Sequence, residues 1–431
     1  MKQKLFYLLI GSCLATTAVA QFEISGEIRP RAEMRNGYKQ LPDTASIPAF
    51  FISQRSRLAF LLKKEKYALK VSFQDVRVWG DELNFSATGV QGNDASIDLK
   101  EAWAEAYITP HITVRFGRQE LKYGDQRMIA TRNWNQHGMS YDAMRVSYEN
   151  AFKLHLVLSY GNSSELVYHQ AYDQVKIRTL NLLYFEKTYM DKLDVIGMYI
   201  LSGMQDPEKP EGIYLKSTPG AALSYSFLGF QLSGSGYFQF GRNASGQNVS
   251  AYLLNANAKY DIGKLEFLAG IDYLSGHNQL STDSAYLKAD HTFDLLYGAR
   301  HRYYGDMDYF SNMKKNTANG GLMDLYFQMS YAINDKLTLN VAYHNFNLQN
   351  NVIDPTVNGE RPAVLNKHLA NEADTKFTWK ISKEIALDLG YSFLRSYDSL
   401  NKIQGISDDE AKNAHWCWLM ITINPVLFTN R

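Results

Sequence analysis

Alternating apolar and polar residues recur in long segments along almost the whole chain. Residues 230–240 place Phe, Leu and Gly on one face and Gln, Ser and Tyr on the other, and residues 152–160, 252–260, 323–331 and 385–393 show the same alternation. A period of two predicts β-strands rather than helices. The segments run to roughly nine residues or more, which exceeds the strands of a soluble sandwich and suits a tilted strand that crosses a membrane. We therefore predict transmembrane strands whose apolar face contacts lipid.

The first twenty residues have the features of a secretory signal peptide. Two lysines precede an apolar run from Leu5 to Ile10, and Ala18-Val19-Ala20 supplies a cleavage motif, so the mature chain is expected to begin at Gln21. A lipoprotein signal that ends at Cys13 is the alternative, but cleavage there leaves a very short apolar core. No later stretch contains eighteen consecutive apolar residues, which excludes a helical membrane span on length.

No linker or change of composition divides the remaining residues 21–431, which are therefore predicted to form one closed sheet. With Cys13 in the signal peptide, Cys417 has no partner for an internal disulfide. The chain has 45 Lys and Arg against 44 Asp and Glu, so an electrostatic function requires local segregation of charge. We predict no nucleic-acid partner and no cofactor.

Short and long connections alternate between the predicted strands. Eight tight turns fall at residues 64–66, 110–111, 150–151, 189–192, 228–229, 261–264, 334–336 and 382–384. Nine longer loops fall at residues 36–50, 80–96, 124–140, 161–175, 203–217, 241–249, 276–321, 348–369 and 397–412. The alternation slips at residues 73–76 and 117–118, where we expect bulges.

Eight turns and nine loops connect eighteen strands, and uncertain strand ends leave sixteen as the alternative. Short periplasmic turns and long extracellular loops are the convention of outer-membrane barrels, and eighteen strands enclose an aqueous channel. The fold class is therefore predicted as all-β, a transmembrane antiparallel up-and-down barrel in the outer membrane of a Gram-negative bacterium, with membrane lipid as its surroundings.

Arginine is concentrated in the first third of the chain, where eleven of the eighteen arginines lie between Arg29 and Arg145. Most of them alternate with apolar side chains, as Arg29 does with Ile28, so their side chains are expected to face the lumen. A charge in lipid would cost about 2–4 kcal/mol at the midplane. The predicted pore-lining residues are Arg29, Arg31, Arg55, Arg57, Asp75, Arg77, Glu101, Glu105, Arg115, Arg118, Arg127, Asp142, Arg145, Glu372 and Asp374.

The carboxylates in this set allow two interpretations. They can pair with the arginines and stiffen the barrel wall. Alternatively, the arginines form a ring of rigid forks that replaces water around a passing carboxylate or phosphate. Both interpretations can hold, with some arginines paired and others free.

Other residues carry weaker signals. His344 and His155 could act as a base near a serine, although lone polar histidines in the lumen explain them more simply; His291 and His301 lack metal-ligand spacing, so no metal site is predicted. The tyrosine-rich segment 276–321 could fold into the mouth as a constriction or decorate the surface. Tryptophans at strand ends either belong to the aromatic girdles at the membrane interfaces or pack as ordinary barrel residues; these are Trp79, Trp103, Trp379, Trp416 and Trp418.

Specific strings resemble the alginate-export family of outer-membrane barrels. The first half contains Arg55-Ser56-Arg57-Leu58, Gln74 to Glu82, Glu101-Ala102-Trp103, Gly117 to Leu121, Tyr123 to Arg127, Trp134-Asn135-Gln136 and Tyr141 to Arg145. The second half contains Leu274-Ser275-Gly276, Tyr297-Gly298 and His301 to Phe310. The likeness covers nearly the whole mature chain and is more specific in its first half.

The resemblance implies an eighteen-stranded barrel whose electropositive lumen lets an acidic polysaccharide leave the cell by diffusion rather than ATP hydrolysis. The pore-lining positions that it implies are Arg55, Arg57, Arg77, Arg118, Arg127 and Arg145, with Asp75 and Asp142. The family's alginate exporter is occluded by long loops on both sides, whereas every periplasmic turn predicted here is short.

Together these features predict a non-enzymatic channel for the passive diffusion of anionic or polar saccharides, through export of an alginate-like polysaccharide or passage of oligosaccharides. A general porin with structural arginines is the alternative, and an outer-membrane hydrolase is a third hypothesis. No plug domain precedes the first predicted strand, which argues against a TonB-dependent receptor. The sequence defines neither the direction of transport nor any periplasmic partner.

Overall fold

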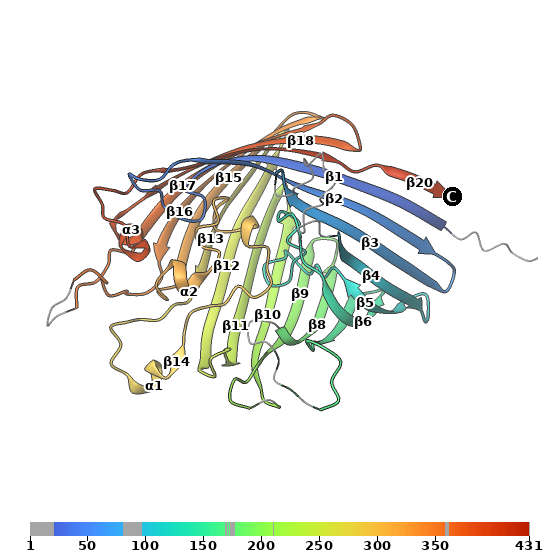
Figure 1. The fold of residues 1–431 in the computed structure, drawn as a ribbon, viewed down its shortest axis with the longest axis horizontal. Helices are drawn as coiled ribbons and strands as arrows, with labels where there is room; N and C mark the ends of the chain where they lie inside the picture. Colours follow the sequence, from blue (N-terminus) through green and yellow to red (C-terminus); the bar gives the residue numbers. More distant parts are fainter. Residues whose placement is uncertain are drawn as a thin grey trace, which may run out of the picture.

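Most of the mature chain is described by the computed structural model, which covers residues 21–80, 97–168, 170, 172, 177–209, 211–357 and 362–430. The predicted signal peptide and nearly all of the loop predicted at residues 80–96 lie outside the described residues. The described part is almost entirely β-structure (Figure 1).

Eighteen antiparallel strands close into a barrel, which confirms the predicted fold class (Figure 1). The first thirteen are β1 (Gln21–Asn36), β2 (Ala49–Lys63), β3 (Tyr67–Val78), β4 (Ile97–Tyr107), β5 (Ile112–Gln119), β6 (Tyr141–Glu149), β7 (Lys153–Tyr160), β8 (Ile177–Tyr189), β9 (Leu193–Gln205), β10 (Ile213–Phe227), β11 (Phe230–Arg242), β12 (Asn248–Ile262) and β13 (Leu265–Leu274). The next four are β15 (Leu322–Asn334), β16 (Leu337–Leu348), β17 (His368–Lys380) and β18 (Ile385–Ser396).

The last wall strand is divided into β19 (Ala414–Ile423) and β20 (Val426–Asn430). Pro425 lies between the two parts, where its missing N–H interrupts the ladder. Both parts pair with β1 and so close the barrel.

The eight tight turns lie where the sequence predicts them, and the longer connections lie at the opposite ends of the strands. The turn between β10 and β11 has Leu228 at φ 47° and Gly229 at φ 84°, as a two-residue hairpin turn requires. The loop predicted at residues 203–217 is shorter than expected, because β9 continues to Gln205 and β10 begins at Ile213.

Of the two expected bulges, one is present and one is replaced by a glycine. The pairing of β3 with β4 shifts at Ser72 and Phe73, where Lys100 of β4 is the extra residue. In β5 the pairing is unbroken, but Gly117 has φ 113° and a Cβ there would lie 2.3 Å from the carbonyl oxygen of Ala102. Only glycine accommodates this approach of β5 to β4.

Two long loops fold into the barrel: the 120–140 loop, between β5 and β6, and the 275–321 loop, between β13 and β15 (Figure 1). They meet inside the barrel, where Ile129 and Tyr297 form a parallel bridge. The 275–321 loop contains α1 (Ser284–Leu287), β14 (Ala289–Asp290), η1 (Arg300–Arg302) and α2 (Met313–Asn316), and α3 (Asp398–Gln404) precedes β19. Within the described ranges, no helix has the length and apolar character of a membrane span.

An apolar core fills part of the barrel interior. The 275–321 loop contributes Phe293, Met307, Tyr309 and Phe310, all without exposed surface. The wall contributes buried residues from many strands, among them Ile200, Leu253, Leu274, Leu322 and Phe346. Burial of each large apolar side chain contributes about 1.5–3 kcal/mol. The 275–321 loop is therefore a packed plug rather than a surface decoration.

Three of the tryptophans considered for the aromatic girdles lie inside the barrel instead. Trp103, Trp416 and Trp418 are buried, whereas Trp79 and Trp379 are exposed. Trp416 donates from Nε1 to Glu33, and Trp134 of the 120–140 loop packs edge to face against Trp416 and Trp418. The loops that enter the lumen supply the packing partners that these strand positions need.

Candidate functional site in the constricted lumen

Arginines of β1 and β2 hold the 120–140 loop inside the barrel. Arg29 donates to the backbone carbonyls of Asn133, Trp134 and Asn135 at 2.8–3.2 Å. Arg55 donates to three carbonyls of the same segment, each at 3.3 Å, and forms an ion pair with Glu27. Both arginines were predicted to line the pore. Their side chains do face inward, but they donate to the carbonyls of a loop and are not free in a water-filled channel.

Arg31 has the same structural role. It pairs with Glu33 at 2.9 Å and lies over the ring of Trp134, with its guanidinium carbon 4.3 Å from the ring centroid. Carbonyl groups of an irregular loop need donors once the loop is buried, and these arginines supply them.

Inward-facing carboxylates anchor the second loop in the same way. Glu372 is fully buried and accepts the N–H of Met307 at 2.7 Å, while Asp374 accepts the N–H of Asp306 at 3.4 Å. Gly305 packs against Glu372, where any Cβ would lie 2.5 Å from a carboxylate oxygen. Glu372 and Asp374, both predicted to line the pore, thus bind the 275–321 loop.

Four further predicted residues form a paired network on the inner wall. Glu105 accepts from Arg115 at 2.8 Å and from Arg145 at 3.3 Å. Glu101 pairs with Lys70 and accepts from Trp103 Nε1. These contacts match the structural interpretation of the lumen charges.

Arg127 is a further buried arginine of the predicted set. It donates to Asp272 at 2.7 Å and to Asp125 at 3.3 Å, and its Nη1 also contacts the hydroxyl of Tyr304 at 3.1 Å. Burial acts to lower the pKa of Arg127, but Asp272 and the other acidic neighbours outweigh it and hold this pKa well above its ordinary value. Arg127 therefore joins the 120–140 loop to the barrel wall and to the 275–321 loop.

Four residues predicted to line the pore lie on the outside of the barrel. Arg118 and Asp142 pair at 2.8 Å with 44% and 67% of their side chains exposed, on the same face as outward Phe116. Asp75 and Arg77 pair at 2.7 Å on the face of β3 that carries exposed Phe73. The pore-lining prediction is wrong for Asp75, Arg77, Arg118 and Asp142. The side chains of β3 and β5 keep alternating through the positions where a slip was expected, and those of β6 alternate in the same register.

Three cavities are considered among those inside the described part of the barrel. The outer cavity, about 360 Å³, lies toward the long-loop end and includes Arg242 and Lys314 in its lining. The middle cavity, about 720 Å³, lies between β1, β2 and the two inward loops. The inner cavity, about 850 Å³, reaches Lys153 and Lys259 near the short turns.

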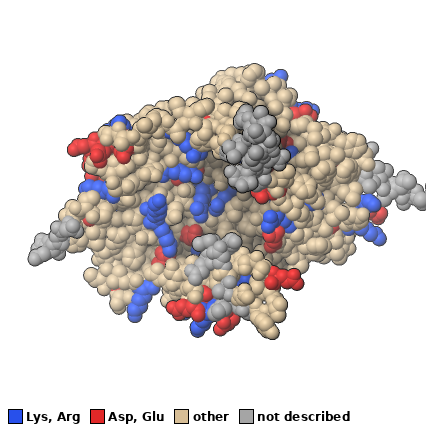
Figure 2. Space-filling model, in the orientation of Figure 1, with Lys and Arg blue, Asp and Glu red and all other residues tan. Residues whose placement is uncertain are grey.

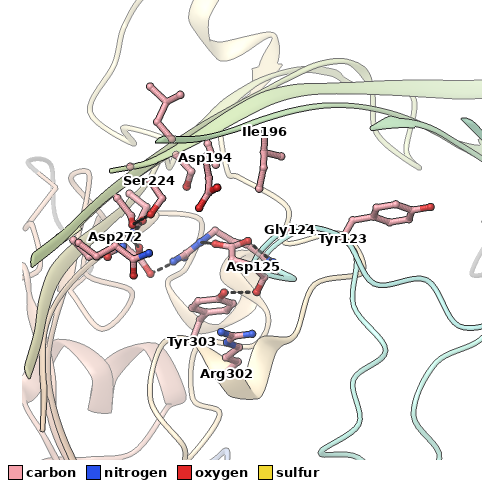
Figure 3. Close-up of a pocket in the computed structure, with 18 of the residues that line it drawn as sticks. Tyr123, Gly124, Asp125, Asp194, Ile196, Ser224, Asp272, Arg302 and Tyr303 are labelled. Carbon is pink, nitrogen blue, oxygen red and sulfur yellow. Dashed lines mark hydrogen bonds and ion pairs between the residues drawn. The ribbon is translucent and has the colours of Figure 1, made fainter. Parts of the chain in front are cut away.

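Neighbouring cavities share lining residues. Arg300 and Ser311 line both the outer and the middle cavity, and Lys122 and Arg302 line both the middle and the inner cavity. Figure 3 shows Arg302 and Tyr303 on the loop side of the inner cavity, opposite Asp194, Ser224 and Asp272 on the strands.

The middle cavity is basic. Its lining has six cationic side chains, Lys39, Arg57, Lys122, Arg132, Arg300 and Arg302, against the three carboxylates Glu27, Glu120 and Asp308. Of the six, only Lys39 has a carboxylate within 4.0 Å among the described residues. Lys and Arg side chains gather around the hollow in the face shown in Figure 2. The arrangement favours anions electrostatically.

Comparison with known protein families matches residues 21–412 of this chain to the alginate export family. This chain belongs to the alginate export family. No curated protein sequence matches it.

Solved structures similar to this alginate export family barrel are outer-membrane proteins. OpdL of Pseudomonas aeruginosa is 12% identical, covers 94% of this chain and 99% of its own, and gives a TM-score of 0.61. OccAB1 of Acinetobacter baumannii, at 11% identity and coverage of 94% and 97%, gives the same TM-score. OpdK of Pseudomonas aeruginosa gives 0.58 at 12% identity. This alginate export family member is an outer-membrane barrel of the porin-like kind.

Most cations that line the cavities of this alginate export barrel were not predicted. Only Arg57 and Arg127 of the predicted set line one of these cavities. Lys122, Arg300 and Arg302 lie in loops, where no alternation of side chains shows from the sequence which of them face the lumen. The sequence marks them only by their position next to or within segments that resemble the alginate export family: Lys122 precedes Tyr123, and Arg302 follows His301.

A half-buried histidine links the loops beside the middle cavity. His301 stacks on Trp134 with ring centroids 4.1 Å apart, and its Nδ1 lies 3.1 Å from Asp308 Oδ1. Tyr38 donates to the other oxygen of Asp308, and Asp306 lies 3.9 Å from His301 Nε2. Burial acts to lower the pKa of His301, but the charge of Asp308 outweighs it and raises this pKa above its ordinary value.

The Asp308 carboxyl shifts in the opposite direction. Burial would raise the pKa of Asp308, yet the positive charge of His301 and the hydrogen bonds from His301 and Tyr38 lower it. A histidine with a raised pKa stabilises the folded form below its unfolded value of about 6.5, and this contribution disappears as pH rises through the folded pKa. The Asp308 contribution disappears only as pH falls through its depressed pKa.

The two inward loops are therefore expected to loosen in alkaline but not in mildly acidic solution. Limited proteolysis of the 275–321 loop measures this: cleavage should speed up as the pH rises above about 6.5 and through the raised pKa of His301. The variant His301→Gln should cleave faster at the lower pH and show a flatter profile. Identical pH profiles for the variant and the wild type would rule out His301 as the responsible group.

Proposed function

We propose that this barrel is a channel for the passive diffusion of anionic or polar saccharides across the outer membrane. The observation that carries the proposal is the middle cavity, in which five of six cationic side chains have no carboxylate partner among the described residues. A cation held without a counter-charge in a partly desolvated passage attracts a permeating carboxylate more strongly than a paired one. Asn133 and Asn135 in the same lining supply groups that can bind sugar hydroxyls.

The general porin with structural arginines is the second candidate, and it accounts for part of the lumen. Arg29, Arg31 and Arg55 bind the 120–140 loop, as that interpretation expects. It does not account for Lys122 and Arg302, which no described carboxylate neutralises at the junction of two cavities. Saccharide passage through a basic constriction is therefore the better-supported function.

A hydrolase is the least supported hypothesis. His344 contacts Asp324 at 2.9 Å, and His155 contacts Glu149 and Tyr123 at 3.0 and 3.3 Å. In the described ranges, no serine is hydrogen-bonded to either imidazole. Neither histidine therefore has beside it, among the described residues, the serine hydroxyl that a serine hydrolase activates.

Ion selectivity tests the proposal directly. Reversal potentials across planar bilayers in a KCl gradient should show a preference for chloride, and the double variant Lys122→Ala with Arg302→Ala should lower the permeability ratio. A unit charge about 4 Å away acts with about 1 kcal/mol in water, so the loss of one such contact corresponds to roughly fivefold.

Arg118→Ala is the matched control, since it removes an arginine from the outer face of the barrel. The control should leave the reversal potential unchanged. Cation selectivity of the wild type, with no change in the double variant, would sink the proposal. Equal entry of uncharged and anionic oligosaccharides of one size into liposomes would favour the general porin.

A further inference from the structure

A row of polar side chains crosses the outer face of the barrel near the long-loop ends of β16, β17 and β18. Asn345 of β16 lies directly opposite Asn371 of β17, which in turn lies directly opposite Arg395 of β18. Tyr343 and Tyr391, an even number of residues away on β16 and β18, are each 46% exposed and face outward. The row therefore lies on the outside of the wall, apart from the three cavities.

The amides of this row form a directed chain of hydrogen bonds. Asn347 donates from Nδ2 to Asn345 Oδ1 at 2.7 Å, and Asn345 donates to Asn371 Oδ1 at 2.7 Å. Asn371 donates to the hydroxyl of Tyr397 at 3.1 Å, and His368 stacks on the Tyr397 ring with centroids 3.9 Å apart. Successive bonds in one direction polarise each other, which strengthens the last donor. That donor is the Tyr397 hydroxyl, whose hydrogen no described residue accepts.

Arg395 ends the row with its guanidinium group unused. Its side chain is exposed, and its guanidinium carbon lies 5.6 Å from the centroid of the Tyr397 ring. Within the described ranges it forms no hydrogen bond and no ion pair. Arg118, on the outer face of β5, differs because two of its N–H groups bind Asp142. Arg395 and Tyr397 therefore offer adjacent donors, one of them charged, to an acceptor from outside the protein.

The surface next to this row, toward the middle of the membrane, is largely apolar. Phe393, Tyr391 and Leu389 precede Arg395 at every second position of β18 and so share its face. Leu389 is 45% exposed, and Tyr343 adds a further exposed ring from β16. Such side chains contact acyl chains in the apolar band of a barrel. A hydrogen-bonding, cationic edge thus adjoins an apolar surface on one face.

We propose that this face binds the phosphate headgroup of an anionic lipid of the outer leaflet, whose acyl chains lie along the apolar side chains of β16 and β18. Planar guanidinium groups match the paired oxygens of a phosphate, and basic side chains at headgroup level recognise anionic lipids. A second copy of the barrel, docked by two-fold symmetry, would bring the same cation to the same surface, so charge complementarity favours the lipid. The headgroup site consists of Asn345, Asn347, His368, Asn371, Arg395 and Tyr397.

Native mass spectrometry of the barrel released from a neutral detergent tests this site. The probes are bis-phosphorylated lipid A and the same lipid after removal of its phosphates. The wild type should retain the phosphorylated lipid saturably and bind the dephosphorylated one roughly tenfold more weakly, as expected for the loss of a charge-assisted hydrogen bond. Arg395→Gln should raise the half-saturating concentration of the phosphorylated lipid by a similar factor.

Tyr397→Phe is the second variant, because it keeps the ring that stacks on His368 and removes only the hydroxyl, so it should weaken binding a few-fold. The control is Arg118→Gln combined with Asp142→Asn, which removes an outward arginine together with its carboxylate and should bind like the wild type. Equal retention of the two lipids, or unchanged retention in Arg395→Gln, overturns the inference. Displacement of the lipid by an equal concentration of inorganic phosphate also overturns it, since the acyl chains would then contribute nothing.

The site is independent of what passes through the lumen. Arg395→Gln should therefore keep the conductance and the ion selectivity of the wild type, because its side chain lies outside the cavities. Cation selectivity of the wild type would defeat the proposed function and leave the lipid site standing. A changed selectivity in Arg395→Gln would contradict its placement on the outer face.

Discussion

Excision of residues 277–319, with Gly276 joined to Gly320, is expected to raise the single-channel conductance several-fold. The excised segment supplies the apolar plug and the border of the outer and middle cavities. The join is geometrically simple, because a Cβ on Gly276 would lie only 2.0 Å from the carbonyl carbon of Gly320. Leu274 already pairs with Leu322, so β13 and β15 become an ordinary hairpin. A barrel of eighteen strands without a plug encloses an open aqueous channel.

Leu287→Ala is the control for this excision, since Leu287 lies on α1 in the same loop with 47% of its surface exposed. It should conduct like the wild type. The excision should also lower the thermal stability of the barrel, because inward Leu253 and Phe346 lose their apolar cover. Heat-induced change of mobility on a gel reports that loss. An unchanged conductance would show that the 120–140 loop alone limits passage.

The alternation of apolar and polar residues along the strands, together with the short turn segments, was sufficient to predict the architecture from sequence. A one-residue slip would move every side chain to the other face, so alternation over a whole strand fixes its register strongly. Connections such as Leu228-Gly229 occur where a strand must reverse, which made the turns visible. The strand count followed from counting these reversals.

The same reasoning failed for individual charges near the suspected irregularities. Asp75 and Arg77 were predicted to line the pore from the family resemblance, with a bulge expected close by in β3. The extra residue is Lys100 of the neighbouring strand, and β3 itself keeps its alternation. Arg118 faces outward for a related reason: Gly117 absorbs the distortion through its positive φ, and no residue is inserted. Local pattern shows that a ladder is irregular, but not which strand carries the extra residue.

The lining of the cavities was beyond sequence reasoning for a different reason. Lys122, Arg132, Arg300 and Arg302 lie in loops, whose path depends on tertiary contacts with distant strands. The anchors of those loops, such as Arg29 and Glu372, were found by phase, yet nothing in the sequence indicated what they would bind. The charged residues of the wall and those of the loops belong to one site. Only the wall residues lie on strands, where the two-residue alternation shows from the sequence which way a side chain faces.

Replacement of Arg127 by Met is expected to have the largest effect of any single substitution on stability. Arg127 and Asp272 are both buried and pair at 2.7 Å, and Asn255 donates to the other oxygen of Asp272 at 2.5 Å. Loss of the guanidinium leaves Asp272 as a buried charge without its main partner. Breaking a buried pair on one side costs about 3–5 kcal/mol. The free energy of unfolding, from urea titration of tryptophan fluorescence in detergent micelles, measures this.

A double-mutant cycle separates the cost of the orphaned charge from the cost of lost packing. Asp272→Asn in the Arg127→Met background removes the uncompensated carboxylate and should recover most of the loss. Arg118→Met breaks an exposed pair of the same type on the outer face, and such pairs contribute about 0–1 kcal/mol, so it should change stability little. If Arg127→Met were as mild as Arg118→Met, the interior would have to be hydrated enough to solvate Asp272. If the double variant recovered nothing, Arg127 would act mainly through its contacts with Tyr303 and Tyr304, where its guanidinium carbon lies 4.0 Å from the Tyr303 ring centroid.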